Sequence, residues 1–173
     1  HGGYSEGAYA SFNCSPFSGD ELERVEKNQT LLFQSLSQAP RHLIIPFQTH
    51  GTKILPVDEK FLGASGQQQQ EMLNGIDALI TTEPGCCICI STADCIPVLL
   101  YDRVHHAVAA VHAGWRGTVE YIVGHTLEKM RAVFGTEGQD VIACIGPGIS
   151  LQSFEVGDEV YEAFRLNGFD MSR

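Results

Sequence analysis

Short apolar runs, many of them rich in β-branched residues, dominate the chain from residue 42 onward, and turn residues separate them. Runs of this length and composition predict strands. Most are continuously apolar, which favours strands that are covered on both faces of a sheet. We therefore expect a substantial sheet from seven runs: HLIIPF (42–47), KILPV (53–57), IDALITT (76–82), CCICI (86–90), IPVLLYD (96–102), HAVAAVHA (106–113) and DVIACIG (140–146).

Three other segments carry apolar residues at helical spacing. The first extends to about residue 37, with Asp20 as the expected N-cap and Glu23 at the capping-box position. The second follows the HAGWRGT turn and covers 118–135, and the third covers about 158–168. The order of helix, strands, helix, strand and helix predicts an α/β or α+β fold, a mixed sheet sandwich flanked by helices.

The remaining segments predict irregular structure. We expect the N-terminal region to form one short strand at about 9–12, and GASGQQQQEMLNG (63–75) to form an exposed loop or a frayed helix end. A length of 173 residues with 43% hydrophobic content suits one core. Residues 1–173 are accordingly predicted to form a single domain.

Composition excludes several classes of partner. With 21 acidic and 11 basic side chains the net charge is −10, and no cluster of Lys or Arg is present that could bind nucleic acid or an anionic membrane. The six cysteines are unevenly spread, which differs from a secreted disulfide framework and favours a cytoplasmic location. No apolar stretch is long enough to span a membrane. The sequence does not indicate an oligomeric state.

Three motifs place a metal-capable side chain at the end of a predicted strand. They are QTHG (48–51), TADC (92–95) and VHAGWRG (111–117). Two imidazoles and one thiolate, from His50, Cys95 and His112, would hold Zn²⁺ and leave a fourth position open, as in catalytic zinc sites. Spacing alone does not show that they meet, because a single His or Cys in a strand is usually a packed side chain.

Further motifs accompany these three. Along the chain they are GGYSEGAYASFN (2–13), GD (19–20), EKN (26–28), DALITT (77–82), IGPGIS (145–150) and FEVGDEV (154–160). The whole set resembles the laccase-domain family, once described as multicopper polyphenol oxidoreductases and now regarded as purine nucleoside phosphorylases. The resemblance covers nearly all 173 residues, and HAGWRGT combined with ADC and QTHG is highly specific.

The resemblance implies an α/β sandwich and a purine nucleoside phosphorylase that also has adenosine deaminase and methylthioadenosine phosphorylase activity. Purine nucleosides and phosphate would be its small-molecule partners. The family's metal ligands fall on His50, Cys95 and His112. Two departures stand out: this chain has Asn28-Gln29 where members usually have Asn-Arg, and members continue beyond Arg173, so the chain is expected to be a fragment.

Three further residues are candidates for the site. Asp94 could accept a hydrogen bond near the metal or transfer protons, or it could simply end a strand. Arg116 could bind phosphate or ribose oxygens, or pair with a surface carboxylate. Gln48 could share a face with His50. In contrast, we expect the Cys86/Cys89 pair to be structural, because residues three apart in a strand point to opposite faces.

Other functions use the same residues. In a metal-free Cys–His hydrolase, His112 would activate the Cys95 thiolate. A zinc-dependent binding module would fill all four coordination positions with protein ligands. Copper-dependent phenol oxidation is the weakest alternative, because it needs many His ligands and only two of the seven His lie in the motifs.

Overall fold

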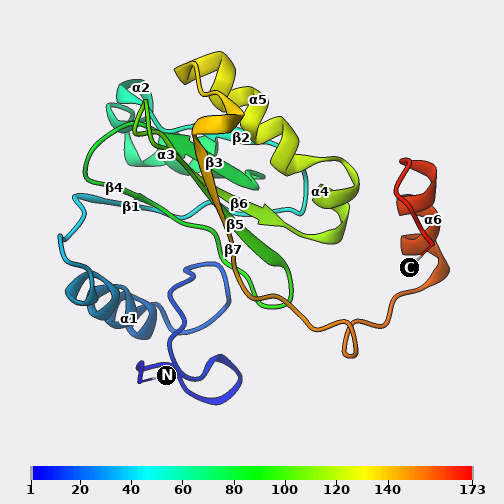
Figure 1. The fold of residues 1–173 in the computed structure, drawn as a ribbon. Coiled ribbons are helices and arrows are strands. Elements are labelled where there is room, and N and C mark those ends of the chain that lie inside the picture. Colours follow the sequence, from blue (N-terminus) through cyan, green and yellow to red (C-terminus); the bar gives the residue numbers. More distant parts are fainter. Residues whose placement is uncertain (1, 173) are drawn as a thin grey trace. The chain divides into compact units, whose positions relative to one another are not determined.

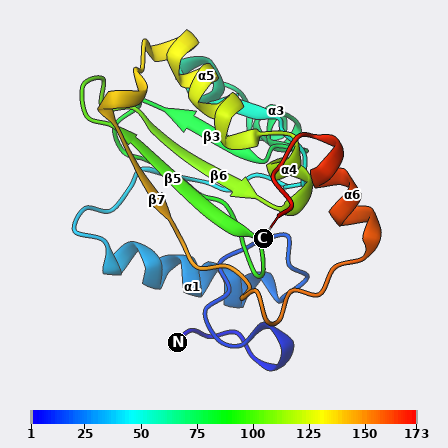
Figure 2. The same cartoon turned by 45° about the vertical axis from the view of Figure 1, so that its right-hand side comes forward.

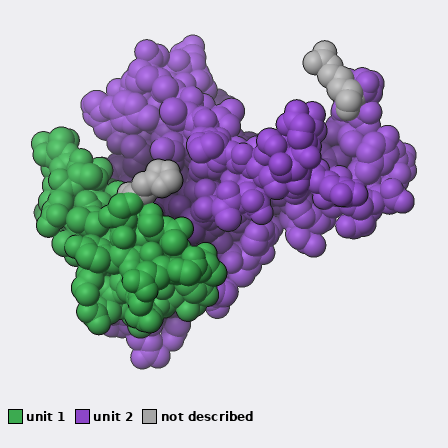
Figure 3. All heavy atoms as spheres, turned by 90° about the horizontal axis from the view of Figure 1, so that it is seen from below, with its two compact units in different colours: residues 1–43, 85–87 green, residues 44–84, 88–173 purple. Residues whose placement is uncertain are grey.

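The computed structural model describes residues 2–172, which fall into two compact units (Figure 3). One unit comprises the described residues up to Leu43 together with Gly85–Cys87. The other comprises Ile44–Pro84 and the described residues from Ile88 onward. No helix within residues 2–172 is both long and apolar enough to cross a membrane.

The first unit is organised around helix α1 (Leu22–Ser35). The buried side chain of Asn28 accepts a hydrogen bond from Tyr4 N and donates to Ser5 Oγ and to the carbonyl of Asn13. These contacts hold the N-terminal segment in an irregular path. The strand predicted at 9–12 is therefore wrong, and the short 3₁₀ helix η1 (Gly7–Tyr9) lies there instead.

Helix α1 also begins differently from the prediction. Its N-cap is Glu21, which makes no side-chain cap hydrogen bond. Asp20 instead accepts hydrogen bonds from the hydroxyl of Ser5 and from Glu21 N. Glu23 forms an ion pair with Lys27 one turn later at 2.7 Å, so the predicted capping box is absent. The carboxylates of Asp20 and Glu23 therefore bind other donors and do not form a capping box.

All seven predicted apolar runs contain strands. Five of the strands form a mixed sheet in the order β2-β3-β6-β5-β7, in which β2 and β3 are parallel and the other pairs antiparallel, while β1 pairs with β4. This mixed sheet with helices confirms the α/β class. The strands are β1 (His42–Ile44), β2 (Ile54–Pro56), β3 (Ala78–Thr81), β4 (Cys86–Ile88), β5 (Ile96–Asp102), β6 (Val108–Ala113) and β7 (Val141–Ile145).

The main core lies between this five-stranded sheet and helix α5 (Ile122–Phe134), which runs across β3 and β6 (Figures 1 and 2). Its buried members include Ile80, Val98, Val111 and Met130. Strand β3 is buried on both faces, as expected for a continuously apolar run.

The same expectation is wrong for β5 and β7. Burial alternates along β5, and Leu99 is 52% exposed. Strand β7 lies at the end of the strand order, and Ile145 is 73% exposed. An apolar run therefore identified these strands correctly but did not show how many of their faces are packed within the described residues.

The segment at 63–75, expected to be an exposed loop or a frayed helix end, contains a capped helix. Ser65 caps helix α3 (Gly66–Leu73) by accepting a hydrogen bond from Gln68 N, and the Gln68 side chain returns a bond to Ser65 N. This capping box satisfies the free N–H groups of the first turn. Shortly before it, the Asp58 side chain caps helix α2 (Glu59–Leu62) by accepting a hydrogen bond from Phe61 N.

The helix predicted at 118–135 is two helices. The HAGWRGT turn already forms α4 (Trp115–Val119), and Tyr121 then adopts a left-handed conformation with φ 57° before α5 begins. Helix α6 (Asp158–Leu166) matches its prediction and lies beside α4 (Figure 2).

Candidate metal centre

Strand register brings the site together. Strands β3 and β6 are antiparallel with Ala78 opposite Val111, so the preceding Asp77 lies beside His112, whose N–H donates to the Asp77 carbonyl at 2.8 Å. Strands β5 and β6 pair Ile96 with Ala113, which places Cys95 at the same end of the hairpin. Sheet geometry thus places His112 near the end of β6 and Cys95 just before the neighbouring strand β5.

The predicted ligands meet in space. One ligand atom from each of His50, Cys95 and His112 can be chosen so that all three lie within 4.8 Å of one another. The two imidazole rings are 4.9 Å apart between centroids, with 71° between their planes. Zinc bond lengths imply ligand separations of about 3.3 to 3.6 Å in a tetrahedral site, so modest inward side-chain rotation would close the site on a metal ion.

Asp77 orients His112. Its buried carboxylate lies 2.8 Å from His112 Nδ1, and His112 itself is only 3% exposed. Because the carboxylate accepts a hydrogen bond from Nδ1–H, the other ring nitrogen, Nε2, is left free for a metal. A carboxylate behind a ligating imidazole is the common arrangement in zinc sites, where it fixes the tautomer and raises ligand basicity.

The same carboxylate closes the turn that carries His50. Backbone N–H groups of Thr49, His50 and Gly51 all donate to Asp77, at 3.2, 2.9 and 2.8 Å. His50 has φ 62°, a left-handed conformation that costs a non-glycine residue about 1 kcal/mol or more. These three hydrogen bonds to one anion stabilise the turn in that conformation.

Electrostatics within the site centre on two acids and one thiol. Burial raises the pKa of Asp77, but hydrogen bonds from His112 and from Gly51, Thr49 and His50 N–H outweigh burial, and the net pKa is lowered. Burial raises the pKa of the half-buried Cys95 thiol, and the charges of Asp94 and Asp77 raise it further. A bound cation would have the opposite effect on Cys95 because it favours the thiolate.

Gly114 leaves the space in which the ligands meet. A Cβ atom at this position would lie 3.1 Å from His50 Cδ2, 3.2 Å from Cys95 Sγ and 3.7 Å from His112 Cε1. No other glycine in residues 2–172 would bring a Cβ within 4 Å of all three ligand residues.

Gln48 links two of the motifs. Its side-chain amide donates to the carbonyl of Ser91 at 2.9 Å, and its Oε1 accepts from Ser91 N at 2.6 Å. Ser91 directly precedes TADC, so this pair of bonds ties the QTHG turn to the segment that leads to Cys95. The structure thus gives Gln48 a positioning contact next to the site.

Asp94 and Arg116 lie at the surface near the ligands. Asp94 is exposed and, together with Cys95, lines a cavity of about 200 Å³. The Arg116 guanidinium lies 4.1 Å from the centre of the Trp115 ring, a cation–π arrangement. Within residues 2–172 Arg116 forms no ion pair with a carboxylate, so its charge remains available to an anion.

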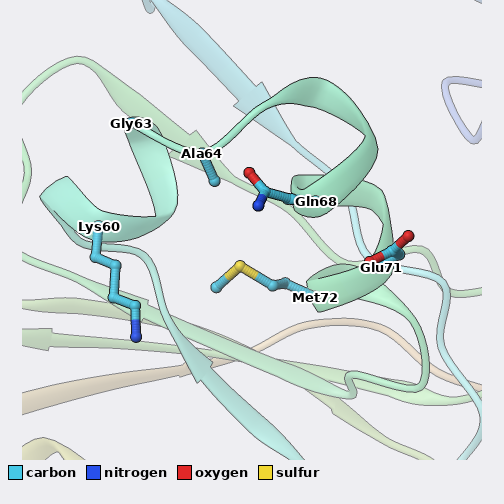
Figure 4. A pocket seen from close by; sticks show the side chains of 6 residues that line it. All are labelled: Lys60, Gly63, Ala64, Gln68, Glu71 and Met72. Atoms are coloured by element: carbon cyan, nitrogen blue, oxygen red, sulfur yellow. The ribbon is translucent and has the colours of Figure 1, made fainter.

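Several other candidates lie outside the cluster. Cys86 and Cys89 are not among its members. The Gln29 side chain, where family members usually have Arg, donates to the carbonyl of Cys14 at 2.9 Å. A wider depression of about 550 Å³ lies between α2 and α3, where Gln68 and Met72 point toward α2 (Figure 4), and no predicted site residue lines it.

Sequence reasoning missed Asp77 as a site residue, whereas the glycine shortly after His112 was expected to leave space for a ligand, as Gly114 does. Both stand in motifs that carried the family resemblance, DALITT and HAGWRGT. An acidic residue directly before a buried strand was the available signal for Asp77, because such a carboxylate must find donors when it is buried.

Comparison with known proteins agrees with the resemblance seen in the motifs. The family model described as "Multi-copper polyphenol oxidoreductase laccase" matches residues 1–172. The chain belongs to this laccase family. Among relatives in the family, a purine nucleoside phosphorylase of Bacteroides thetaiotaomicron is 66% identical over 172 residues, which are 99% of this chain and 64% of that protein. Adenosine deaminase RL5, from an unknown prokaryotic organism, is 38% identical over 95% of this chain and 63% of its own length.

A solved structure shows the same fold. YlmD from Geobacillus stearothermophilus matches with a TM-score of 0.86 and 31% identity, over 96% of this chain and 62% of that chain. The chain therefore spans somewhat less than two thirds of the length of these laccase-family relatives.

Proposed function

We propose that this protein is a zinc-dependent enzyme of purine nucleosides, one that cleaves inosine, adenosine or methylthioadenosine with phosphate and deaminates adenosine. The observation that carries the proposal is the convergence of His50, Cys95 and His112 on one point, with Asp77 behind His112. Three protein ligands with an open position are typical of catalytic zinc. The names of two relatives, a purine nucleoside phosphorylase and an adenosine deaminase, support the substrate class.

Each site residue has a role in this proposal. Zinc, when bound, supplies Lewis-acid chemistry at its open position. Asp77 orients the His112 ring and closes the backbone turn that carries His50, and Gln48 holds the Cys95 segment against that turn. Asp94, exposed beside Cys95, moves protons, and the guanidinium of Arg116, which forms no ion pair within residues 2–172, binds phosphate or ribose oxygens.

Composition supports the setting of this chemistry. A net charge of −10 and unevenly spread cysteines favour a reducing, cytoplasmic location with small-molecule partners. Copper is the less suitable metal for the function, in spite of the family's name. Within residues 2–172 the structure has one group of three metal-capable side chains, whereas multicopper oxidation needs several His-rich sites.

A Cys–His hydrolase is the second candidate. The contact between Asp77 and His112 favours it, because a carboxylate also orients the base in a Cys–His–acid arrangement. The raised pKa of Cys95 counts against it, since a nucleophilic cysteine needs a lowered pKa. This hydrolase reading also assigns no role to His50.

Metal analysis tests the zinc assignment. Purified protein should contain about one zinc per chain, and Cys95→Ala should lose most of it. A double variant, Cys86→Ser with Cys89→Ser, is the control and should retain the metal. Full zinc occupancy in Cys95→Ala would refute the ligand set.

Turnover assays test the reaction. With the full-length protein, inosine and phosphate should give hypoxanthine and ribose 1-phosphate. Adenosine should give adenine with phosphate, or inosine and ammonia with water. If zinc-loaded protein converts none of these nucleosides and an alkylating agent labels Cys95 rapidly, the hydrolase replaces the phosphorylase.

A further inference from the structure

The cavity beside Cys95 has an aromatic lining. Trp115, Phe154 and Phe164 contribute to its wall, and the ligand Cys95 lies in the same wall. Asp94 and Thr118 supply the polar side chains of the lining, apart from the thiol. The cavity is thus mostly apolar. Asp94 and Thr118 provide its hydrogen-bonding groups, and Cys95 places one side of it next to the candidate metal centre.

The outer wall of this cavity is held by a stack of aromatic rings. Phe164 of α6 meets Phe169 edge to face at 4.9 Å, and Phe169 stacks on Tyr121 at 5.2 Å. The Tyr121 hydroxyl donates to the carbonyl of Asn167 at 2.9 Å. Helix α6 is thereby joined to the corner between α4 and α5, so Phe164 has a defined position.

The inner wall is tied to the strand that leads away from Cys95. The N–H of Ile149 donates to the carbonyl of Asp94 at 2.9 Å, and Gly146 N donates to the carbonyl of Pro97 at 2.8 Å. The IGPGIS segment is therefore fixed along the start of β5. The cavity thus forms from separate segments that each have their own contacts.

Size and chemistry select its occupant. A volume of about 200 Å³ is below the roughly 300 to 1,000 Å³ of pockets that enclose whole drug-sized ligands. It suits a flat ring system, whose apolar faces pack against aromatic side chains. A purine also has nitrogen atoms around its edge, which Asp94 and Thr118 can meet. Phosphate would meet no cationic side chain in this lining, because Arg116 lies outside it, and the ribose hydroxyls would meet few polar groups there.

We propose that this cavity is the base-binding pocket, in which Trp115, Phe154 and Phe164 hold the purine ring next to the metal centre. The inference rests on the proposed function and adds the location of the base to it. It also makes Phe154 and Phe164 determinants of substrate specificity.

Trp115 allows a direct binding test, because it is the single Trp of the chain. Inosine is added to zinc-loaded protein in phosphate-free buffer, where phosphorolysis cannot consume it. We expect a saturable change in Trp115 emission with inosine and a much weaker response to uridine or ribose. Phe154→Leu and Phe164→Leu should each weaken inosine binding about 3- to 10-fold.

Tyr161→Leu is the matched control, because Tyr161 lies on the same helix α6, is 46% exposed and does not line the cavity. It should leave inosine affinity unchanged. Circular dichroism and zinc content on each variant show whether fold and metal are retained, and calorimetric titration of inosine measures affinity independently of the fluorophore.

The outcomes separate the two proposals. Equal inosine affinity in wild type, Phe154→Leu and Phe164→Leu, with the fold intact, would place the base elsewhere. If phosphorolysis proceeds with an unchanged KM for inosine in both variants, the pocket assignment fails while the proposed function stands. If inosine binds as expected but no nucleoside is converted, the pocket stands and the proposed activity fails.

Discussion

Replacing Gly114 by Ala should weaken zinc binding while preserving the fold. The new Cβ would lie 3.1 Å from His50 Cδ2 and 3.2 Å from Cys95 Sγ, about 0.3 and 0.2 Å short of the 3.4 Å at which ordinary contact begins. Metal sites tolerate ligand displacements of about 0.2 Å. We therefore expect zinc affinity to fall about 10- to 100-fold, or roughly 1.4 to 2.8 kcal/mol.

The backbone at this position accepts alanine. Gly114 has φ −72° and ψ 167°, which any residue can adopt, so the substitution introduces no backbone strain. Gly124→Ala is the matched control, because its Cβ would meet only Tyr121 Cβ at 3.9 Å. In the first turn of α5 that change should not destabilise the protein, because alanine has the higher helix propensity, and it should leave zinc affinity unchanged.

Competition with a chromophoric chelator measures zinc affinity in wild type and both variants, and thermal unfolding measures stability. Wild-type affinity in a folded Gly114→Ala protein would refute the reasoning, because it would show that the three ligands do not meet at this glycine. A similar loss of zinc in Gly124→Ala would also refute it, since that glycine lies away from the ligands.

Asp77→Asn should lower zinc affinity about 10- to 100-fold in the same chelator assay, because it removes the carboxylate that orients His112. Asp102→Asn is the control: it removes a buried carboxylate 2.8 Å from His105 Nδ1 and should leave zinc affinity unchanged. Equal losses of zinc affinity in both variants would show a general effect of stability. Although burial raises the pKa of Asp102, hydrogen bonds including those from His105 lower it well below the usual range, so its stabilising effect is present above about pH 4 and lost as pH falls. Urea unfolding should show the stability difference between wild type and Asp102→Asn shrinking below about pH 4, and a constant difference would contradict this. Arg116→Ala should bind zinc normally but raise the phosphate KM, or lower kcat/KM, about 10- to 100-fold, while Arg131→Ala should change neither; a lowered Tm with unaltered phosphate dependence would make Arg116 structural.

Secondary structure could be predicted where hydrophobic pattern decides it. Every apolar run contains a strand, because such runs have few alternatives to burial in a sheet. Helix α3 was predicted only as a loop or a frayed helix end, because its four consecutive glutamines have no apolar stripe, although the capping box at Ser65 and Gln68 was present in the sequence. The break at Tyr121 was missed because a left-handed tyrosine has no sequence signature comparable to glycine.

The three candidate ligands were predicted from their motifs, and the structure brings them together, whereas Asp77 was not predicted. Its importance depends on the register between β3 and β6, which places it beside His112, and on the turn that folds back onto its carboxylate. Neither relation can be obtained from spacing in a single sequence. The cavity wall could not be predicted from spacing either, because the path of the chain after β7 brings Phe154 and Phe164 to the same cavity as Trp115.

The carboxylate shared by His50 and His112 has a consequence for metal exchange. Because the turn at 49–51 is closed by bonds to Asp77, the backbone that carries one imidazole and the ring of the other have partners within the protein that do not depend on a metal. Fixing a residue costs about 1 to 2 kcal/mol, and that cost is met during folding instead of during binding. Removal of zinc by a chelator should then leave a folded apoprotein that binds zinc again to full occupancy. The metal at the proposed site could therefore be exchanged without unfolding the protein.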